Sequence, residues 1–268
     1  MERVRVAVQG ASGKMGREVI NAVCGSPDME LVGALEKETP QSFLTLPGGG
    51  KDVPFGSNAK DLITTVKPDV IVDFSSAQAS MSTARIAGET GVNLVIGTTG
   101  LSEDNVREIE NICRSKGIGA VVASNFALGA VLMIHLAKIL AKYFDYAEII
   151  EMHHEKKADA PSGTAITTAR AMAEAKGSPF VCPQTQKETL PGTRGGQNNG
   201  ISIHSVRLPG LMAHQEIILG ASGQTLTLRH DTISRECYMP GVLMAVREVV
   251  KTKKFINGLD NLLGLQEF

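Results

Sequence analysis

A strand that leads through a glycine-rich turn into a helix, at the N-terminus, constrains the fold of this chain more than any other feature. The strand is predicted over Val4–Val8, the turn reads GASGKMG over Gly10–Gly16, and the helix covers Glu18–Val23. In doubly wound α/β folds such a turn binds a dinucleotide pyrophosphate, because glycines let the backbone approach the phosphates at the helix N-terminus. The spacing G-x-x-G-x-x-G departs from the usual G-x-G-x-x-G, so a turn that serves packing alone is the alternative.

Alternating strands and helices continue through the first half of the chain. Short apolar runs are typical of parallel strands that are buried on both faces. Further strands are predicted over Glu30–Leu35, Val70–Phe74, Leu94–Gly97 and Gly119–Ala123, with a helix over Gln78–Thr90. The glycine- and proline-rich stretch Pro40–Gly56 is predicted to be a loop outside the core. We therefore expect an α/β fold with an N-terminal Rossmann-type, doubly wound parallel sheet.

After Asn125 the pattern changes to an α+β arrangement with a mostly antiparallel sheet. The predicted elements are helices Leu128–Phe144 and Thr164–Lys176, strands Ala147–Met152, Ile201–Leu208, His214–Gly220 and Gln224–His230, and a polar loop Thr185–Gly200. We place a first domain at residues 1–126 and a second at 127–235. The last helices, within residues 236–268, can pack on either domain as far as their own sequence shows.

An acidic residue stands where a dinucleotide-binding fold needs one. Glu36 follows Gly16 by 20 residues and ends the second strand, the position from which an acid binds the adenosine ribose. Lys37 beside it is a cation for the 2′-phosphate of NADPH. The pair predicts NADH, NADPH or both as cofactor, and a solvated charge pair is the alternative.

Two further loops follow strands at the rim where such sheets bind ligands, Gly97–Gly100 and Ala123–Phe126. Their small residues would let a nicotinamide approach the backbone, and Phe126 would flank its ring. Plain strand-to-helix turns are the alternative. The predicted cofactor-binding residues are Gly10, Ala11, Ser12, Gly13, Lys14, Met15, Gly16, Glu36, Lys37, Gly97, Thr98, Thr99, Ser124, Asn125 and Phe126.

The segment from His153 to Thr164 combines imidazoles, a lysine and a helix start. Imidazoles titrate near neutral pH and can donate protons, while Lys157 is a fixed cation. Backbone N–H groups at the start of the following helix, over Ser162–Thr164, suit an anion. We predict a site for an anionic substrate, with a structural histidine pair and a Ser162 N-cap as the alternative.

Charge and cysteine content exclude several other functions. With 27 Lys and Arg against 28 Asp and Glu the net charge is −1, so we expect no nucleic-acid partner and no anionic membrane surface. The four cysteines lack metal-ligand spacing, and we expect unpaired thiols and no metal. We expect a cytoplasmic protein, or one of the plastid stroma if a transit peptide preceded Met1.

Taken together, the motifs resemble those of the 4-hydroxy-tetrahydrodipicolinate reductase family, also called dihydrodipicolinate reductase. The resemblance covers nearly the whole chain. The motifs are GASGKMG (10–16), VDFSS (72–76), GTTG (97–100), SNFALG (124–129), EMHHEKKADAPSGTA (151–165) and SVRLPGLMAHQEIILG (205–220). Ser75 and Ala127 stand where the family often has Thr and Ser, and neither touches the expected chemistry.

The resemblance implies a reductase of lysine (diaminopimelate) biosynthesis that reduces a small cyclic dicarboxylate with NADH or NADPH. It also implies a homotetramer, a second domain for substrate binding and tetramerisation, and a C-terminal segment 236–268 that returns to the dinucleotide-binding domain. The implied catalytic residues are His153 as acid and Lys157 as a second proton donor or carboxylate anchor. The implied substrate contacts are His154, Lys157, Ser162, Gly163 and Thr164.

Two other classes remain as alternatives at this point. A dinucleotide-binding sensor without catalysis would bind cofactor and show no turnover. A different small-substrate dehydrogenase would act without the cyclic dicarboxylate, although no cysteine has the context of a catalytic aldehyde dehydrogenase thiol.

Overall fold

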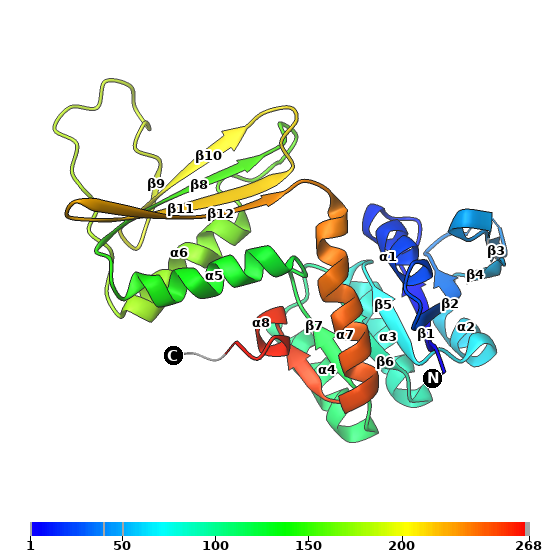
Figure 1. Cartoon of the computed structure of the whole chain (residues 1–268). Helices are drawn as coiled ribbons and strands as arrows, with labels where there is room; N and C mark the ends of the chain where they lie inside the picture. Colours follow the sequence, from blue (N-terminus) through cyan, green and yellow to red (C-terminus); the bar gives the residue numbers. More distant parts are fainter. Residues whose placement is uncertain (1, 40, 50, 266–268) are drawn as a thin grey trace. The chain divides into compact units, whose positions relative to one another are not determined.

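The computed structural model describes residues 2–39, 41–49 and 51–265, and the chain divides into two compact units (Figure 1). Of the described residues, unit 1 holds those up to Leu128 together with 235–265, and unit 2 holds Gly129–Ser234. Residues 266–268 of the C-terminal segment lie outside the described residues. Unit 1 is therefore built from two separate stretches of the chain, whereas unit 2 is continuous.

Unit 1 contains a sheet in the order β13-β7-β6-β5-β1-β2-β4-β3. All neighbours pair in parallel except β3, which is antiparallel to β4. This confirms the predicted doubly wound parallel sheet. The strands are β1 (Val4–Gln9), β2 (Met29–Leu35), β3 (Phe43–Leu44), β4 (Val53–Gly56), β5 (Val70–Asp73), β6 (Asn93–Ile96), β7 (Ala120–Val122) and β13 (Phe255–Asn257).

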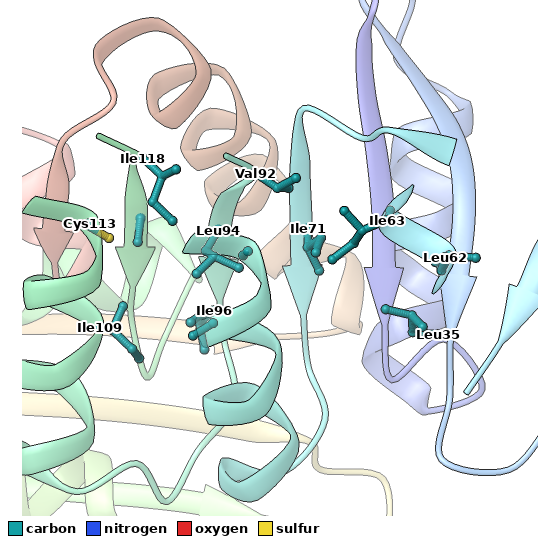
Figure 2. Close-up of a cluster of buried hydrophobic side chains, with 14 of the residues drawn as sticks. Leu35, Leu62, Ile63, Ile71, Val92, Leu94, Ile96, Ile109, Cys113 and Ile118 are labelled. Carbon is teal, nitrogen blue, oxygen red and sulfur yellow. The ribbon is translucent and has the colours of Figure 1, made fainter. Parts of the chain in front are cut away.

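Helices cover both faces of this sheet. On one face α2 (Ala59–Val66), α3 (Ala77–Thr90) and α4 (Glu103–Lys116) pack over the strands and bury a cluster that includes Ile63, Ile71, Leu94, Ile96 and Ile109 (Figure 2). On the other face α1 (Lys14–Cys24) contacts α7 (Met239–Thr252), which also packs on β5, β6 and β7. The short α8 (Leu259–Leu262) follows β13. The apolar strands are thus buried on both sides, which is why they lack polar alternation.

The expectation of a loop over Pro40–Gly56 was wrong for Phe43–Leu44 and Val53–Gly56, which form β3 and β4. Val53 and Phe55 are buried at 7% and 6% exposure, and β4 pairs with β2. The strand has only four residues, one of which is Pro54, so its alternation is short and its composition resembles that of a loop. Residues 40 and 50 lie outside the described residues.

Unit 2 contains a five-stranded sheet in the order β12-β11-β8-β10-β9, and α5 and α6 lie on one side of it (Figure 1). Only the central β8–β10 pair is parallel, which confirms the predicted mostly antiparallel sheet. The elements are α5 (Leu128–Ala141), β8 (Tyr146–His153), α6 (Gly163–Lys176), β9 (Gly196–Asn198), β10 (Ile201–Arg207), β11 (Ala213–Ala221) and β12 (Gln224–Thr232). Among the described residues, no helix is both long and apolar enough to cross a bilayer.

The predicted loop Thr185–Gly200 also contains a strand, β9, which pairs antiparallel with β10. Asn199 and Gly200 connect the two strands with φ values of 51° and 80°. Two successive residues of positive φ are typical of a type I′ hairpin turn, for which Asn-Gly is the strongest short-range sequence signal. This dipeptide was the signal that could have identified the hairpin.

Candidate active site

The glycine turn brings the start of α1 against the end of β1. Gly10 has a φ of 76°, and its N–H donates to the carbonyl of Leu35 at 2.9 Å. A Cβ at Gly16 would overlap the Gly10 carbonyl and lie 2.8 Å from Cα of Ala11, so only glycine allows this approach. No side chain of the described residues caps α1 at Gly13. Its first N–H groups can therefore bind an anion.

Glu36 lies directly beside this turn. Its Oε2 accepts a hydrogen bond from the Ser12 N–H at 3.0 Å, and its Oε1 accepts one from the Lys37 N–H at 3.0 Å. Glu36 is half-buried, whereas Ser12 and the Lys37 side chain are exposed. The predicted acid is thus held at the turn by two backbone N–H groups, and the neighbouring cation is open to solvent.

A buried polar cluster connects the first rim loop, after β6, with the turn that follows β5. Asp73 Oδ1 accepts hydrogen bonds from Ser75 Oγ at 2.6 Å, from Ser75 N at 2.9 Å and from Thr98 Oγ1 at 3.2 Å. Gln9 Nε2 donates to Ser75 Oγ at 3.1 Å. Burial raises the pKa of Asp73, and the hydrogen bonds from Ser75 and Thr98 only partly oppose this. The cluster therefore fixes the turn after β5 and the first rim loop to the ends of their strands.

The predicted cofactor residues at the first rim loop have divided roles. Thr98 is buried, and its hydroxyl belongs to the Asp73 cluster, so this side chain supports the loop from below. A Cβ at Gly97 would overlap the Phe74 ring, which gives the glycine a packing role. Thr99 is exposed at the rim.

In the second rim loop, Asn125 and Phe126 make contacts within the protein. Asn125 Oδ1 accepts a hydrogen bond from the Ala127 N–H at 2.9 Å and so shapes the turn, while Ser124 is exposed. Phe126 is only 1% exposed, and its ring meets Phe74 edge-on with centroids 5.9 Å apart. The Phe126 ring thus packs in the core of unit 1, and its contact with a nicotinamide stays a prediction.

In unit 2, His153 ends β8 with its ring held by a buried carboxylate. His153 Nδ1 lies 2.6 Å from Glu151 Oε2. Arg207, the register partner of His153 on β10, binds both oxygens of the same carboxylate, with Nη1 at 2.9 Å from Oε2 and Nη2 at 2.8 Å from Oε1. Glu151 is 0% exposed, whereas the His153 side chain retains 15% exposure. The imidazole is thus anchored at one nitrogen.

The charges of this cluster follow from its burial and its partners. Burial alone would raise the pKa of Glu151, but the Arg207 guanidinium and His153 hold it below its usual value. Burial lowers the pKa of His153, and the nearby Glu151 carboxylate only partly opposes this, while Lys157 and Arg207 add to the decrease. At neutral pH the protein without ligand therefore contains an anionic Glu151, a cationic Arg207 and a neutral His153.

The loop after β8 presents the predicted lysine. Lys157 Nζ donates to Asp159 Oδ1 at 2.7 Å, and its side chain is 22% exposed. The Lys157 N–H donates to the carbonyl of His154 at 3.2 Å, and His154 itself is exposed. Arg207 also donates to the Asp159 carbonyl at 2.7 Å, so the cluster at Glu151 restrains this loop as well.

At the start of α6, the three residues predicted to bind a carboxylate differ in their exposure. Ser162 is buried, its Oγ accepts from the Ala165 N–H at 3.3 Å as an N-cap, and its own N–H donates to Glu151 Oε1 at 3.2 Å. Both polar groups of Ser162 are therefore engaged, and the N-cap alternative is confirmed for its side chain. Gly163 and Thr164 are exposed, and a Cβ at Gly163 would meet nothing within 4 Å. The first N–H groups of α6 thus face open space.

Sequence reasoning missed Glu151, Arg207 and Asp73. One signal for Glu151 was present, since it falls in phase with the inward-facing residues Ala147 and Ile149 of β8, and a buried charge requires a partner. That partner, Arg207, lies 56 residues further along the chain, which no local pattern indicates. The described residues contain no group of three or more His, Cys, Asp and Glu that could hold a metal.

The parallel sheet with its glycine turn and acid, and a second unit with an imidazole beside an open helix N-terminus, define the class of two-domain dinucleotide-dependent oxidoreductases. Family models described as dihydrodipicolinate reductase match both parts of the chain, the N-terminus over residues 4–126 and the C-terminus over residues 129–263. The chain belongs to the dihydrodipicolinate reductase family.

Individual relatives match over almost their full length. A protein of Dehalococcoides mccartyi named 4-hydroxy-tetrahydrodipicolinate reductase is 50% identical over 265 residues, which cover 99% of this chain and 100% of the relative. A protein of the same name from Moorella thermoacetica is 46% identical, with 97% and 98% covered. The solved structure of a dipicolinate-bound dihydrodipicolinate reductase from Paenisporosarcina sp. TG-14 has a TM-score of 0.86 at 41% identity, with 97% and 99% covered.

Proposed function

We propose that this chain reduces 4-hydroxy-tetrahydrodipicolinate to tetrahydrodipicolinate with NADH or NADPH, a step of lysine biosynthesis. The observation that carries the proposal is in unit 2, where an anchored imidazole at the end of β8 and the open N-terminus of α6 bind the same buried carboxylate, Glu151. A proton donor and an anion-binding helix start suit a dicarboxylate that must be protonated as it is reduced. The names of the relatives and the dipicolinate bound to one of them support the same substrate class.

The proposed cofactor site lies in unit 1. A reduced nicotinamide dinucleotide supplies the hydride when bound. The close approach at Gly16 and the uncapped start of α1 fit a pyrophosphate, and the Glu36 carboxylate beside Ser12 fits the hydroxyls of a ribose. Lys37 is exposed next to Glu36, where it suits a 2′-phosphate, so we propose that both cofactors are used.

His153 is the proposed proton donor. Its neutral imidazole becomes protonated more easily when an anionic dicarboxylate lies beside it, because negative charge favours the imidazolium. Nδ1 is occupied by Glu151, so Nε2 is the nitrogen that delivers the proton to the reduced ring. Lys157 is proposed as a second donor or as a carboxylate anchor, with Asp159 holding it in the loop until the substrate binds.

The substrate carboxylates are proposed to bind at the start of α6. The N–H groups of Gly163 and Thr164 lie in its first turn, where helix N–H groups have no partner within the helix, and the space next to Gly163 is open. The exposed His154 is proposed as a further contact. Ser162 acts through its N-cap and its bond to Glu151, and not through direct contact.

We also propose a homotetramer that is assembled through the face of the second sheet opposite α5 and α6. Tyr146 on this face is 44% exposed, and Ile150 and Ile218 lie between ion pairs formed by Glu148 and Glu216. Each isoleucine pairs across the strands with one of the two glutamates, and a face that mixes apolar side chains with ion pairs fits a subunit interface, in which polar groups are common. The relatives named above are bacterial, which favours the cytoplasm over a plastid.

The test is turnover with the condensation product of pyruvate and aspartate semialdehyde. Wild-type protein is expected to oxidise NADH or NADPH, and His153→Gln is expected to lose about 10²–10⁴-fold in kcat, the usual contribution of a proton donor, with its fold intact. His135→Gln, on α5 outside the site, is the matched control and should retain activity. Cofactor binding without any turnover would favour the sensor alternative and contradict the proposal.

A further inference from the structure

The Glu151 carboxylate is the point at which all parts of the unit 2 site meet. Its Oε2 contacts His153 Nδ1 at 2.6 Å and Arg207 Nη1 at 2.9 Å, and its Oε1 contacts Arg207 Nη2 at 2.8 Å and Ser162 N at 3.2 Å. Each oxygen thus has two of these donors, and the Ser205 side chain on β10 is a further hydrogen-bond partner of the carboxylate. The carboxylate is 0% exposed and has no access to substrate from solvent, so any effect on the reaction must pass through its neighbours.

We propose that Glu151 is the positioning residue of this site: it holds His153 in the tautomer with the proton on Nδ1, directs Nε2 toward the substrate, and fixes the start of α6 through Ser162. The inference rests on the proposed function for its catalytic consequence, but the tautomer is a property of the protein alone. A carboxylate that is kept anionic by Arg207 can only accept, so the His153 nitrogen that faces it must donate.

Arg207 completes the arrangement by compensating the buried charge. Its bidentate contact keeps Glu151 ionised. A further hydrogen bond, from Nη2 to the Asp159 carbonyl at 2.7 Å, connects the loop that carries Lys157 to the Glu151–Arg207 pair. The charged groups that bear on the His153 ring are Glu151 on its own strand, Arg207 on β10 and Lys157 in the loop, which is paired with Asp159. On β11 the residue opposite His153 is Ala213, which carries no charge.

A plain structural ion pair between Glu151 and Arg207 makes different predictions from a positioning residue. If Glu151 acts through His153, its removal costs nothing further once His153 is absent, because residues that act as a unit are not additive. If the pair serves folding alone, the two losses in activity multiply. The two roles also differ in their effect on the pH profile, since only charges beside the imidazole move its titration.

The first measurement is the ¹⁵N NMR signature of the histidine rings in the full-length protein, with His153 assigned by comparison with His153→Gln. Wild type is expected to show a proton on Nδ1 of neutral His153. Free histidine favours the proton on Nε2, so the result distinguishes the two cases without any assay of activity. A proton on Nε2 of His153 in the wild type would overturn the proposal whatever reaction the protein catalyses.

The second measurement is kinetic, with Glu151→Gln and a matched control, Glu148→Gln. Glu148 lies on the same strand and also contacts an arginine and a histidine, Arg194 and His204, but it has no bond to His153. Glu151→Gln is expected to lower kcat about 10–10²-fold, because the Gln NH2 in place of Oε2 no longer accepts the His153 Nδ1 proton. The change in substrate KM should be less than about threefold, because the Gln oxygen in place of Oε1 can still accept from the Ser162 N–H and hold the start of α6. Glu148→Gln should leave the kcat and the His153 tautomer unchanged, with light scattering to verify the assembly.

The pH dependence of kcat/KM tests the direction in which each charged neighbour moves the pKa of His153. Loss of the Glu151 charge removes an influence that raises the pKa of His153, so the alkaline limb of kcat/KM should move to lower pH in Glu151→Gln. Loss of the Arg207 cation should move the same limb to higher pH in Arg207→Gln, and Arg207→Lys should restore it. Shifts in the same direction for Glu151→Gln and Arg207→Gln would refute the positioning role.

The double variant Glu151→Gln/His153→Gln tests whether Glu151 acts through His153. It should be no less active than His153→Gln alone, and a further loss of tenfold or more would show that Glu151 does not act through His153. The Gln amide must place a donor against Arg207 or Ser162, so Glu151→Gln is at risk of misfolding. In that event the wild-type tautomer and the Arg207→Gln and Arg207→Lys profiles decide the question.

Discussion

Replacing Gly16 with alanine should damage both the stability of unit 1 and its binding of a dinucleotide. The added Cβ would overlap the Gly10 carbonyl oxygen and lie 2.8 Å from both the Ala11 Cα and the Gly10 carbonyl carbon. Carbon atoms in contact normally lie about 3.5–4.0 Å apart, so the start of α1 must move away by about 1 Å. All three atoms belong to the backbone, and no side chain can rotate to make room.

The size of both effects follows from that displacement. Forcing a methyl group into a closely packed position costs about 1–3 kcal/mol, and the backbone contacts place Gly16→Ala near the upper limit. At about 2–4 °C per kcal/mol for a unit of this size, Tm should fall by about 6–12 °C. A misplacement of about 1 Å is worth about 10²-fold in activity, so kcat/KM for the cofactor should fall by roughly that factor.

Thermal unfolding followed by circular dichroism and initial rates at varied NADH measure the two effects. Gly25→Ala at the other end of α1 is the matched control, because Gly25 has a φ of −80° and its added Cβ would lie 3.4 Å from the nearest atom, the Asn21 carbonyl oxygen. That variant should match wild type or gain about 0.4–1 kcal/mol. If Gly16→Ala behaves as Gly25→Ala does, the close approach of α1 to the turn is not what the glycine provides.

Three further substitutions and one reagent test other parts of the molecule. Glu36→Ala removes the acceptor beside Ser12 and should raise KM for NADH about tenfold. Lys37→Ala should weaken the binding of NADPH more than the binding of NADH. Equal effects of both variants on the KM of both cofactors would exclude these roles. Gly163→Ala places a methyl group in open space at the start of α6 and should raise the substrate KM about tenfold. Tm should stay the same or rise, because alanine favours a helix over glycine by about 0.5–1 kcal/mol. An unchanged KM would show that no substrate carboxylate binds at Gly163. Burial raises the pKa of the Cys113 thiol to about 11 and also raises the pKa of Cys24. Because Cys24 is exposed and Cys113 is buried, a disulfide reagent at about pH 8 should label Cys24 faster than Cys113 in native protein, as mass spectrometry of the labelled peptides would show. Because the folded pKa of Cys113 exceeds the value of about 8.5 for free cysteine, its contribution to stability is complete below about pH 8.5 and is lost toward pH 11.

The sequence predicted those parts of the fold that local periodicity encodes. The apolar runs from Val70 and Leu94 became buried parallel strands, and the change of pattern after Asn125 marked the antiparallel sheet. The strands Phe43–Leu44, Val53–Gly56, Gly196–Asn198 and Phe255–Asn257 were missed, because they lack the continuous apolar run that identified the equally short β5 and β6. Pairing with β2, which buries Phe55, depends on residues far along the chain.

The candidate site was predictable in its exposed residues and not in its support. His153, Lys157 and the start of α6 lie in one segment, so their chemistry could be read together. Glu151, in contrast, looked like one more charge in a charged segment, and its role depends on Arg207 of another strand. The burial of Phe126 against Phe74 was equally invisible, since an aromatic residue after a strand suits a ligand as well as a core.

The return of the C-terminal segment to unit 1 has a consequence for synthesis on the ribosome. Every residue of the continuous unit 2 is made before α7 and β13, which supply one helix of a covering layer and one edge strand to the first sheet. Until then the nascent chain exposes the β7 edge and the apolar surface that Val242, Val246 and Val249 later cover. Unit 2 can therefore complete its folding while the N-terminal sheet, although synthesised first, still waits for its last components.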